Sequence, residues 1–148
     1  MRKIKIAQIG TPDEIYNHPD WRLEDMMWAF ENREVKAIIA NIGGNDAHKL
    51  FPYLNPKVIR ENPKIFCGYS DVMNLHLYCY QLGLSTFYGP NLLTNVAEAQ
   101  GWHPYCKEWF CKVLFEDGVI GEIKPSARGE LEITSLNEAY LRDHLLDV

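Results

Sequence analysis

The segment KIFCGYSDVMNLHLYCYQLG, residues 64–83, decides the fold class. Three apolar residues run into Gly68, which is typical of a short buried strand. Between residues 71 and 82 the apolar side chains recur at helical spacing, and Gly83 is well placed to end a helix. The segment therefore predicts a strand that passes directly into a helix, with the hydroxyl of Ser70 in the turn between them.

The flanking sequence repeats this alternation of strand and helix. Residues 35–41 (VKAIIAN) read as a strand buried on both faces, whereas residues 11–20 are polar and contain two prolines, so we expect a loop there. Alternating strands and helices indicate a parallel sheet with crossover connections. Further strands are expected at residues 3–9, 85–88 and 119–123, and further helices at 21–31, 47–53, 56–61, 103–115 and from 136 onwards.

The composition is that of one soluble globular domain. The chain has 148 residues, of which 47% are hydrophobic and 24% charged, and its net charge of -5 argues against nucleic acid or an anionic membrane as a partner. No apolar run approaches the roughly 20 residues that a membrane helix needs, and the start lacks the apolar stretch of a signal peptide. We therefore expect a cytoplasmic protein.

The four cysteines do not form a recognisable metal site. No CxxC pair exists, and Cys106 and Cys111 lie five positions apart with His103 nearby. Structural zinc sites use tighter paired spacings and four ligands. The pattern favours buried or half-buried thiols over a metal centre.

Two loops are expected at the carboxyl ends of strands, where parallel sheets place their functional sites. The first is GYSD, residues 68–71. A serine in a strand-to-helix turn has its Oγ pushed away from the sheet, and the N–H of Asp71 would face an oxyanion beside Ser70, as in a nucleophile elbow. Val72 stands where the usual GxSxG motif has glycine, so Ser70 or Asp71 acting simply as a helix cap is the competing interpretation.

The second loop is GGND, residues 43–46. Two glycines after a strand allow a ligand to approach the backbone, and their N–H groups would suit a carboxylate, a phosphate or an oxyanion. An ordinary turn in which Asn45 or Asp46 caps the next helix explains the same letters. No nucleotide-binding glycine motif is present.

A serine nucleophile also needs a base, which is normally a histidine oriented by an acid. His76 follows Ser70 by six residues on the same expected helix and cannot reach back to its Oγ. His48 follows the glycine loop and is placed either to line the site or to face solvent. The remaining histidines, at 18, 103 and 144, are at no evident strand end, so the sequence offers a nucleophile without an obvious base.

Taken together, residues 37–93 resemble the S66 serine peptidases, the family of the LD-carboxypeptidases and the MccF-type microcin C immunity proteins. The resemblance rests on an ordered set of motifs: GG, then FPYL, then NPK and GYSD, then GLSTFYGP. GGND followed by FPYL is closer to the MccF branch. The resemblance implies an α/β, flavodoxin-like parallel sheet with flanking helices, the nucleophile domain of that family.

The resemblance also implies the site residues and the reaction. Ser70 matches the family nucleophile, and the backbone N–H groups of Asp71 and Gly44 match its oxyanion donors. Such enzymes use no metal or cofactor and hydrolyse an amide near a carboxyl terminus by acyl transfer, here of a muropeptide or a microcin-like peptidyl nucleotide. The residues expected to bind this small peptide substrate are Gly43, Asn45, Asp46, Tyr88, Gly89 and Pro90.

The chain departs from the family pattern in length. Family members are much longer, and their base histidine and its glutamate lie in a carboxyl-terminal domain; Glu138 and His144 come too early to match them. We therefore expect an incomplete nucleophile domain at residues 1–125, a linker or domain start at 126–148, and a fragment with little activity alone. A homodimer, or a second chain carrying the other domain, would supply the base. The alternatives are a non-catalytic remnant that binds ligand and a truncated product that folds poorly.

Overall fold

The computed structural model describes residues 11–97 and 101–126. The chain divides into two compact units, Met1–Glu116 and Asp117–Val148, and every helix and strand of the described residues lies in the first unit. The strand expected at residues 3–9 and the helix expected from 136 lie outside the described residues, and the domain boundary at residue 125 stays a prediction.

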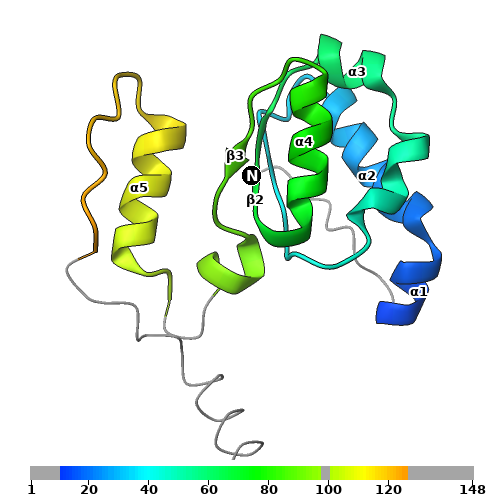
Figure 1. Cartoon of the computed structure of the whole chain (residues 1–148), viewed down its shortest axis with the longest axis horizontal. Coiled ribbons are helices and arrows are strands. Elements are labelled where there is room, and N and C mark those ends of the chain that lie inside the picture. The colour runs from blue at the N-terminus through cyan, green and yellow to red at the C-terminus, as the bar shows by residue number, and fades with distance from the viewer. Residues whose placement is uncertain (1–10, 98–100, 127–148) are drawn as a thin grey trace, which may run out of the picture. The chain divides into compact units, whose positions relative to one another are not determined.

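The first unit contains a parallel sheet of three short strands in the order β1-β2-β3. Figure 1 labels β2 and β3. The strands are β1 (Ala37–Ile39), β2 (Ile65–Gly68) and β3 (Phe87–Tyr88). Both neighbouring pairs are parallel, so the α/β class predicted from the alternation of elements is confirmed. The prediction that residues 35–41 are buried on both faces is wrong: Ala37 is exposed, and Ile38 and Ile39 are only half-buried.

The helices mostly follow the predicted positions, with one correction near the start. Residues 11–20 are not a loop, because Thr11 and Glu14 form a reciprocal capping box that starts a helix at Pro12. The Thr11 N–H donates to the Glu14 carboxylate at 2.7 Å, and this bond lowers the pKa of Glu14. The α-helices are α1 (Pro12–Asn17), α2 (Pro19–Glu31), α3 (Pro56–Glu61), α4 (Met73–Gln81) and α5 (Pro104–Phe115). The shorter helical segments are the 3₁₀ helices η1 (Ala47–Tyr53) and η2 (Ser70–Val72) and the π-helical turn η3 (Leu92–Val96).

The strand predicted at residues 119–123 is also wrong. The described residues of the second unit, 117–126, contain no strand, and Val119 is 97% exposed. Gly118 and Gly121 have φ of 145° and 75°, which interrupts the extended backbone that a strand requires. A short run of apolar residues is not enough to make a strand where the backbone turns twice.

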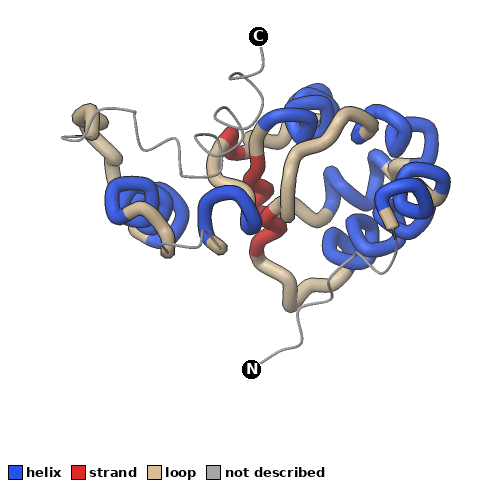
Figure 2. Tube along the Cα trace, turned by 90° about the horizontal axis from the view of Figure 1, so that it is seen from below, coloured by secondary structure: helices blue, strands red, loops and turns tan. Residues whose placement is uncertain are grey.

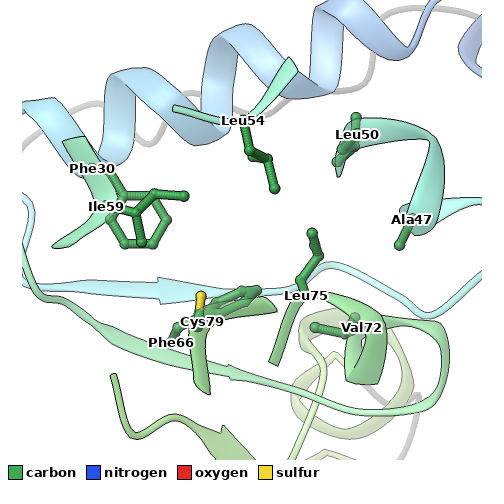
Figure 3. Packing of buried hydrophobic residues seen from close by; sticks show 9 residues of the cluster. All are labelled: Phe30, Ala47, Leu50, Leu54, Ile59, Phe66, Val72, Leu75 and Cys79. Carbon is green, nitrogen blue, oxygen red and sulfur yellow. The ribbon is translucent and has the colours of Figure 1, made fainter. Parts of the chain in front are cut away.

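The core lies between the sheet and the helices α2, η1, α3 and α4 (Figure 3). In Figure 2 these helices lie to one side of the red strands. Phe66 from β2 and Phe30 from α2 are 3% and 1% exposed, and Ile59 from α3 is fully buried between the elements. The core residues are Phe30, Ala47, Leu50, Leu54, Ile59, Phe66, Val72, Leu75 and Cys79.

This core fixes the site because η1 and α4 both begin at loops that follow strands. β1 leads through residues 43–46 into η1, and β2 leads through Ser70 into α4. No helix in the part of the chain that the structure describes is both long and apolar enough to cross a membrane.

Candidate active site

Ser70 occupies a sharp turn between β2 and α4. Its φ is 64°, and it is the only residue other than glycine with a positive φ in the described part of the chain. A side chain in this left-handed region costs free energy, so the surrounding structure must hold it there. Since Gly68 ends the strand and η2 starts at Ser70, the turn has no spare residue that would relax this backbone.

Side chains from the end of β3 and from the segment after it bind backbone N–H groups of the turn. The Tyr69 N–H donates to the Asn91 Oδ1 at 3.1 Å, and the Ser70 N–H donates to the Tyr88 hydroxyl at 3.3 Å. Asn91 is fully buried, and its backbone N–H donates to the Asn95 Oδ1 at 3.1 Å. Sequence reasoning missed Asn91; its position directly after the YGP segment, which begins at the end of β3, was the available signal.

His76 supports the same turn from α4. Its Nε2 lies 2.9 Å from the carbonyl oxygen of Gly68, and because a carbonyl only accepts, Nε2 carries the hydrogen. The ring is 5% exposed, and its Nδ1 is buried without a hydrogen-bond partner. His76 is therefore a structural donor to the end of β2, in agreement with the prediction that it cannot serve Ser70.

The glycine loop at residues 43–46 packs directly against Ser70. A Cβ placed on Gly43 would lie 2.8 Å from the Ser70 Cβ and 2.9 Å from its Oγ, so a larger residue does not fit without displacement. A Cβ on Gly44 would lie 3.3 Å from the Asp71 Oδ2. The two loops that the sequence singled out thus meet, as the carboxyl ends of parallel strands must.

Gly68 is equally constrained. A Cβ there would lie 2.7 Å from the Ala40 Cβ, 2.9 Å from the Asn91 Oδ1 and 3.0 Å from the Val72 Cγ1. The predicted need for a small residue at this position is confirmed. The close approach of Ala40 shows why: the ends of β1 and β2 come together beneath the turn.

The side chain of Asp71 ties the two loops to each other. Its Oδ2 accepts the N–H groups of Asp46 and Ala47, both at 2.8 Å, and its Oδ1 accepts from the Asn74 Nδ2 at 2.8 Å. The carboxylate of Asp46 receives both terminal nitrogens of Arg22, at 2.9 and 2.8 Å. Sequence reasoning gave Asp71 a backbone oxyanion role or a helix cap, and it did not find the link to the glycine loop, Arg22 or Asn74.

The other predicted substrate-binding residues lie around these loops. Asn45 is exposed, Tyr88 is 61% exposed, and Asp46 is 8% exposed with its carboxylate engaged by Arg22. A cavity of about 950 Å³ borders the glycine loop, and its lining includes Gly43, Gly44, Asn45, Asp46 and Asp71. Ser70 is not among its lining residues, so the cavity reaches the glycine loop and Asp71 but not the candidate nucleophile.

Gly89 and Pro90 pack on a cysteine behind the turn. A Cβ on Gly89 would lie 3.0 Å from the Cys67 Sγ, which in turn lies 3.7 Å from the Pro90 carbonyl oxygen. Cys67 is 1% exposed, and burial raises the pKa of its thiol to about 11. A thiol with such a pKa stays protonated at neutral pH, so Ser70 and not Cys67 is the candidate nucleophile.

The structure does not place His18, His48 or His103 as a base for Ser70. His18 stacks on Trp21 with ring centroids 4.5 Å apart, and its Nδ1 lies 3.6 Å from Asp20. His48 is exposed on η1, and His103 stands at the N-cap of α5. Glu138 and His144 lie outside the described residues. No group of three or more metal-ligating side chains occurs within residues 11–97 and 101–126.

Comparison with known families decides the assignment. A family model for the N-terminal domain of LD-carboxypeptidases, peptidase family S66, matches residues 3–89. The chain belongs to the S66 peptidase family. The glycine loop, β2 and the turn at Ser70 therefore lie inside the matched domain, whereas Pro90 and Asn91 lie just after it.

Individual relatives extend the match. A probable murein peptide carboxypeptidase of Bacillus subtilis is 38% identical over 99 residues, which are 66% of this chain and 30% of that protein. The microcin C7 self-immunity protein MccF of Escherichia coli is 38% identical over 84 residues, or 56% of this chain and 24% of that protein.

Solved structures of MccF-type proteins share the fold. An MccF-like protein from Streptococcus pneumoniae, in complex with AMP, has a TM-score of 0.68 and 32% identity over 84% of this chain and 38% of its own. MccF in complex with aspartyl sulfamoyl adenosine has a TM-score of 0.61 and 34% identity over 67% of this chain and 30% of its own. The chain thus spans less than two fifths of the length of these relatives.

Proposed function

We propose that this chain is the nucleophile-bearing part of an S66 serine carboxypeptidase, with Ser70 as the nucleophile. The observation that carries the proposal is the φ of 64° at Ser70, in a turn from strand to helix that packs against Gly43. A helix cap needs no such backbone, because a capping serine takes an extended conformation. Backbone strain of this kind is concentrated at functional sites.

The proposed reaction is acyl transfer. A base accepts the Ser70 proton as the Oγ attacks the carbonyl carbon of the amide, and the N–H groups of Asp71 and Gly44 stabilise the oxyanion. The base then protonates the leaving amine as the C–N bond breaks, and water hydrolyses the resulting ester to a carboxylate and restores Ser70. The loop residues Gly43, Asn45 and Asp46 and the segment of Tyr88, Gly89 and Pro90 would contact the substrate. Neither step requires a metal or a cofactor.

The substrate is proposed to be a small peptide or peptidyl nucleotide that is cleaved at an amide bond near a carboxyl terminus. Similarity to the probable murein peptide carboxypeptidase of Bacillus subtilis supports a muropeptide as the substrate. The nucleotide ligands of the MccF-type structures support a peptidyl nucleotide. The GGND and FPYL motifs support the second.

We expect low activity from the chain by itself. His76 and His18 are engaged elsewhere and His48 is exposed on η1, so we propose that the base comes from a second copy or from another chain. Serine hydrolases without their histidine keep roughly 10³–10⁴-fold catalysis over water, about 10⁶-fold less than the complete triad gives. The same geometry without a base would make a domain that binds the ligand but does not turn it over.

Hydrolysis of an LD-linked muropeptide and of aspartyl sulfamoyl adenosine by the purified chain tests the proposal. Ser70→Ala is the test variant, and Ser85→Ala, which alters an exposed serine in the turn before β3, is the matched control. Turnover that Ser70→Ala abolishes and Ser85→Ala keeps would support the nucleophile and show that a base is present.

Binding distinguishes the remaining outcomes. Calorimetric binding of one ligand without turnover would favour the ligand-binding alternative or an enzyme that lacks its base. Turnover that survives in Ser70→Ala would refute the role of Ser70, and a folded chain that neither binds nor cleaves either compound would refute the function.

A further inference from the structure

The carboxylate of Asp71 accepts more hydrogen bonds than a residue at the start of a helix needs to. One oxygen accepts two backbone N–H groups from the loop between β1 and η1, and the other accepts the Asn74 amide. Each of these bonds is 2.8 Å long, which is the range of charge-assisted hydrogen bonds. Asp71 thus connects α4, to which Asn74 belongs, with the loop that follows a different strand.

The two backbone hydrogen bonds to Asp71 come from the last residue of the glycine loop and the residue after it. Asp46 directly precedes η1 and forms no side-chain cap for it, so the N–H groups of Asp46 and Ala47 depend on Asp71. Gly44 lies so close that a Cβ there would be 3.3 Å from the same Asp71 oxygen. A shift of this carboxylate would therefore move the backbone of the loop.

Arg22 provides a second anchor for the same residue. Its two terminal nitrogens bind both oxygens of Asp46, and the two side chains are only 23% and 12% exposed. Bidentate pairing of this kind fixes orientation as well as distance. Asp71 therefore binds the backbone N–H of Asp46, and Arg22 of α2 binds its carboxylate.

We propose that the Asp71 carboxylate is a positioning group that sets the glycine loop against Ser70, with Arg22 fixing the other side of the loop through Asp46. This inference rests on the proposed function, in which the N–H groups of Asp71 and Gly44 share one oxyanion. Asp71 would then donate to that oxyanion through its backbone and place the second donor through its side chain. The loop and the elbow would move as one unit.

The arrangement of acceptors makes a sharp test available. Asp71→Asn leaves one acceptor oxygen, so its amide nitrogen must face either the two backbone N–H groups or the donor nitrogen of Asn74. In the double variant Asp71→Asn/Asn74→Asp, the amide oxygen of the first side chain can accept both backbone bonds. Its amide nitrogen then donates to the carboxylate of the second, while the bond from the Asn74 Nδ2 to the Asp71 backbone carbonyl, 3.0 Å long, is lost.

The measurement is amide NMR and hydrogen exchange on the ¹⁵N-labelled full chain. Asp71→Asn is expected to raise exchange at the Asp46 and Ala47 amides about tenfold or more, since hydrogen bonds to charged groups contribute about 1.5–3 kcal/mol. It should also shift the amide resonances of Gly43 and Gly44. The double variant should return both signals toward wild type, and Glu61→Gln, the same carboxylate-to-amide change at an exposed site, should leave them unchanged.

Three results would overturn the proposal. Unaltered Gly43 and Gly44 resonances in folded Asp71→Asn would mean that the carboxylate only caps η1. Failure of the folded double variant to restore the signals would remove the role of the acceptor pattern. If Asp71→Asn does not fold, Arg22→Lys serves instead, and Gly43 and Gly44 amides that this change leaves unmoved would refute the coupling. The readout needs no turnover, so it stands or fails separately from the hydrolysis experiment.

Discussion

At position 70 the backbone and the side chain have opposite requirements. A hydroxyl is needed if the residue is a nucleophile, yet a φ of 64° is a conformation that glycine adopts at much lower cost. The neighbouring bonds from Asn91 and Tyr88 to the turn hold the residue in place. We therefore expect the strained backbone at Ser70 to lower the stability of the fold in return for the position of the hydroxyl.

Ser70→Gly is therefore expected to be more stable than Ser70→Ala. The glycine relieves the left-handed strain that alanine retains, and we expect a gain of about 1 kcal/mol in the free energy of unfolding. Urea denaturation of both variants measures this difference. Ser85→Gly is the control, because Ser85 has no positive φ and glycine there should lower stability by about 0.5–1 kcal/mol. Equal stability of the two position-70 variants would contradict the strain argument.

At the scale of elements, the short helices depend on their caps. α3 has only six residues, which is too short to be stable by itself in water. It starts with Asn55, whose Oδ1 accepts from the N–H groups of Lys57 and Val58 at 3.1 and 3.2 Å, followed by Pro56. Its bounds agreed with the sequence prediction because this signal is local, whereas the capping box at Thr11 and Glu14 was overlooked.

Asn55→Ala should cost about 1 kcal/mol of stability, the usual value for removal of an N-cap side chain. The loss arises because two N–H groups of the first turn lose their acceptor, and it is measured by urea denaturation. Lys57→Ala is the control on the same helix: its ion pair with Glu61 is exposed and 4.0 Å long, so its effect should stay within about 0.5 kcal/mol. A control that is as destabilised as Asn55→Ala would mean that the loss does not come from the cap.

At the scale of the whole molecule, the core contains groups that respond to pH. Cys67 and Cys79 are each 1% exposed, and burial raises the pKa of both thiols to about 11 from 9.0. The unfolded chain therefore releases these protons at a lower pH than the folded chain does. Stability linked to these thiols is fully present below pH 9 and is lost as the pH rises toward 11.

The free energy of unfolding should accordingly fall between pH 9 and pH 11, and part of that fall should belong to the two thiols. Urea denaturation across this range, compared with the double variant Cys67→Ala/Cys79→Ala, isolates their contribution from that of other titrating groups. The variant is expected to have lower stability at pH 8, because it loses buried volume, but a shallower fall. If the free energy of unfolding falls equally steeply in both proteins, deprotonation of the two thiols does not contribute to the pH dependence of stability.

The sequence by itself determined what depends on neighbouring residues. The strand-to-helix passage around Gly68 and Ser70, the parallel class and the caps of α3 follow from apolar spacing and from residues within three or four positions of one another. The strand expected at residues 119–123 failed because the pattern of side chains does not report the backbone turns at its glycines.

Only the tertiary structure decided which polar groups meet at the candidate site. Arg22 and Asp46 are 24 positions apart, Asp46 and Asp71 are 25 apart, and Tyr69 and Asn91 are 22 apart. Each of these contacts forms because two strands end at the same edge of the sheet and a buried core fixes the helices beside them. Local sequence carries no record of such a distance, so the left-handed Ser70 and the second role of the Asp71 carboxylate become visible only when the chain is folded.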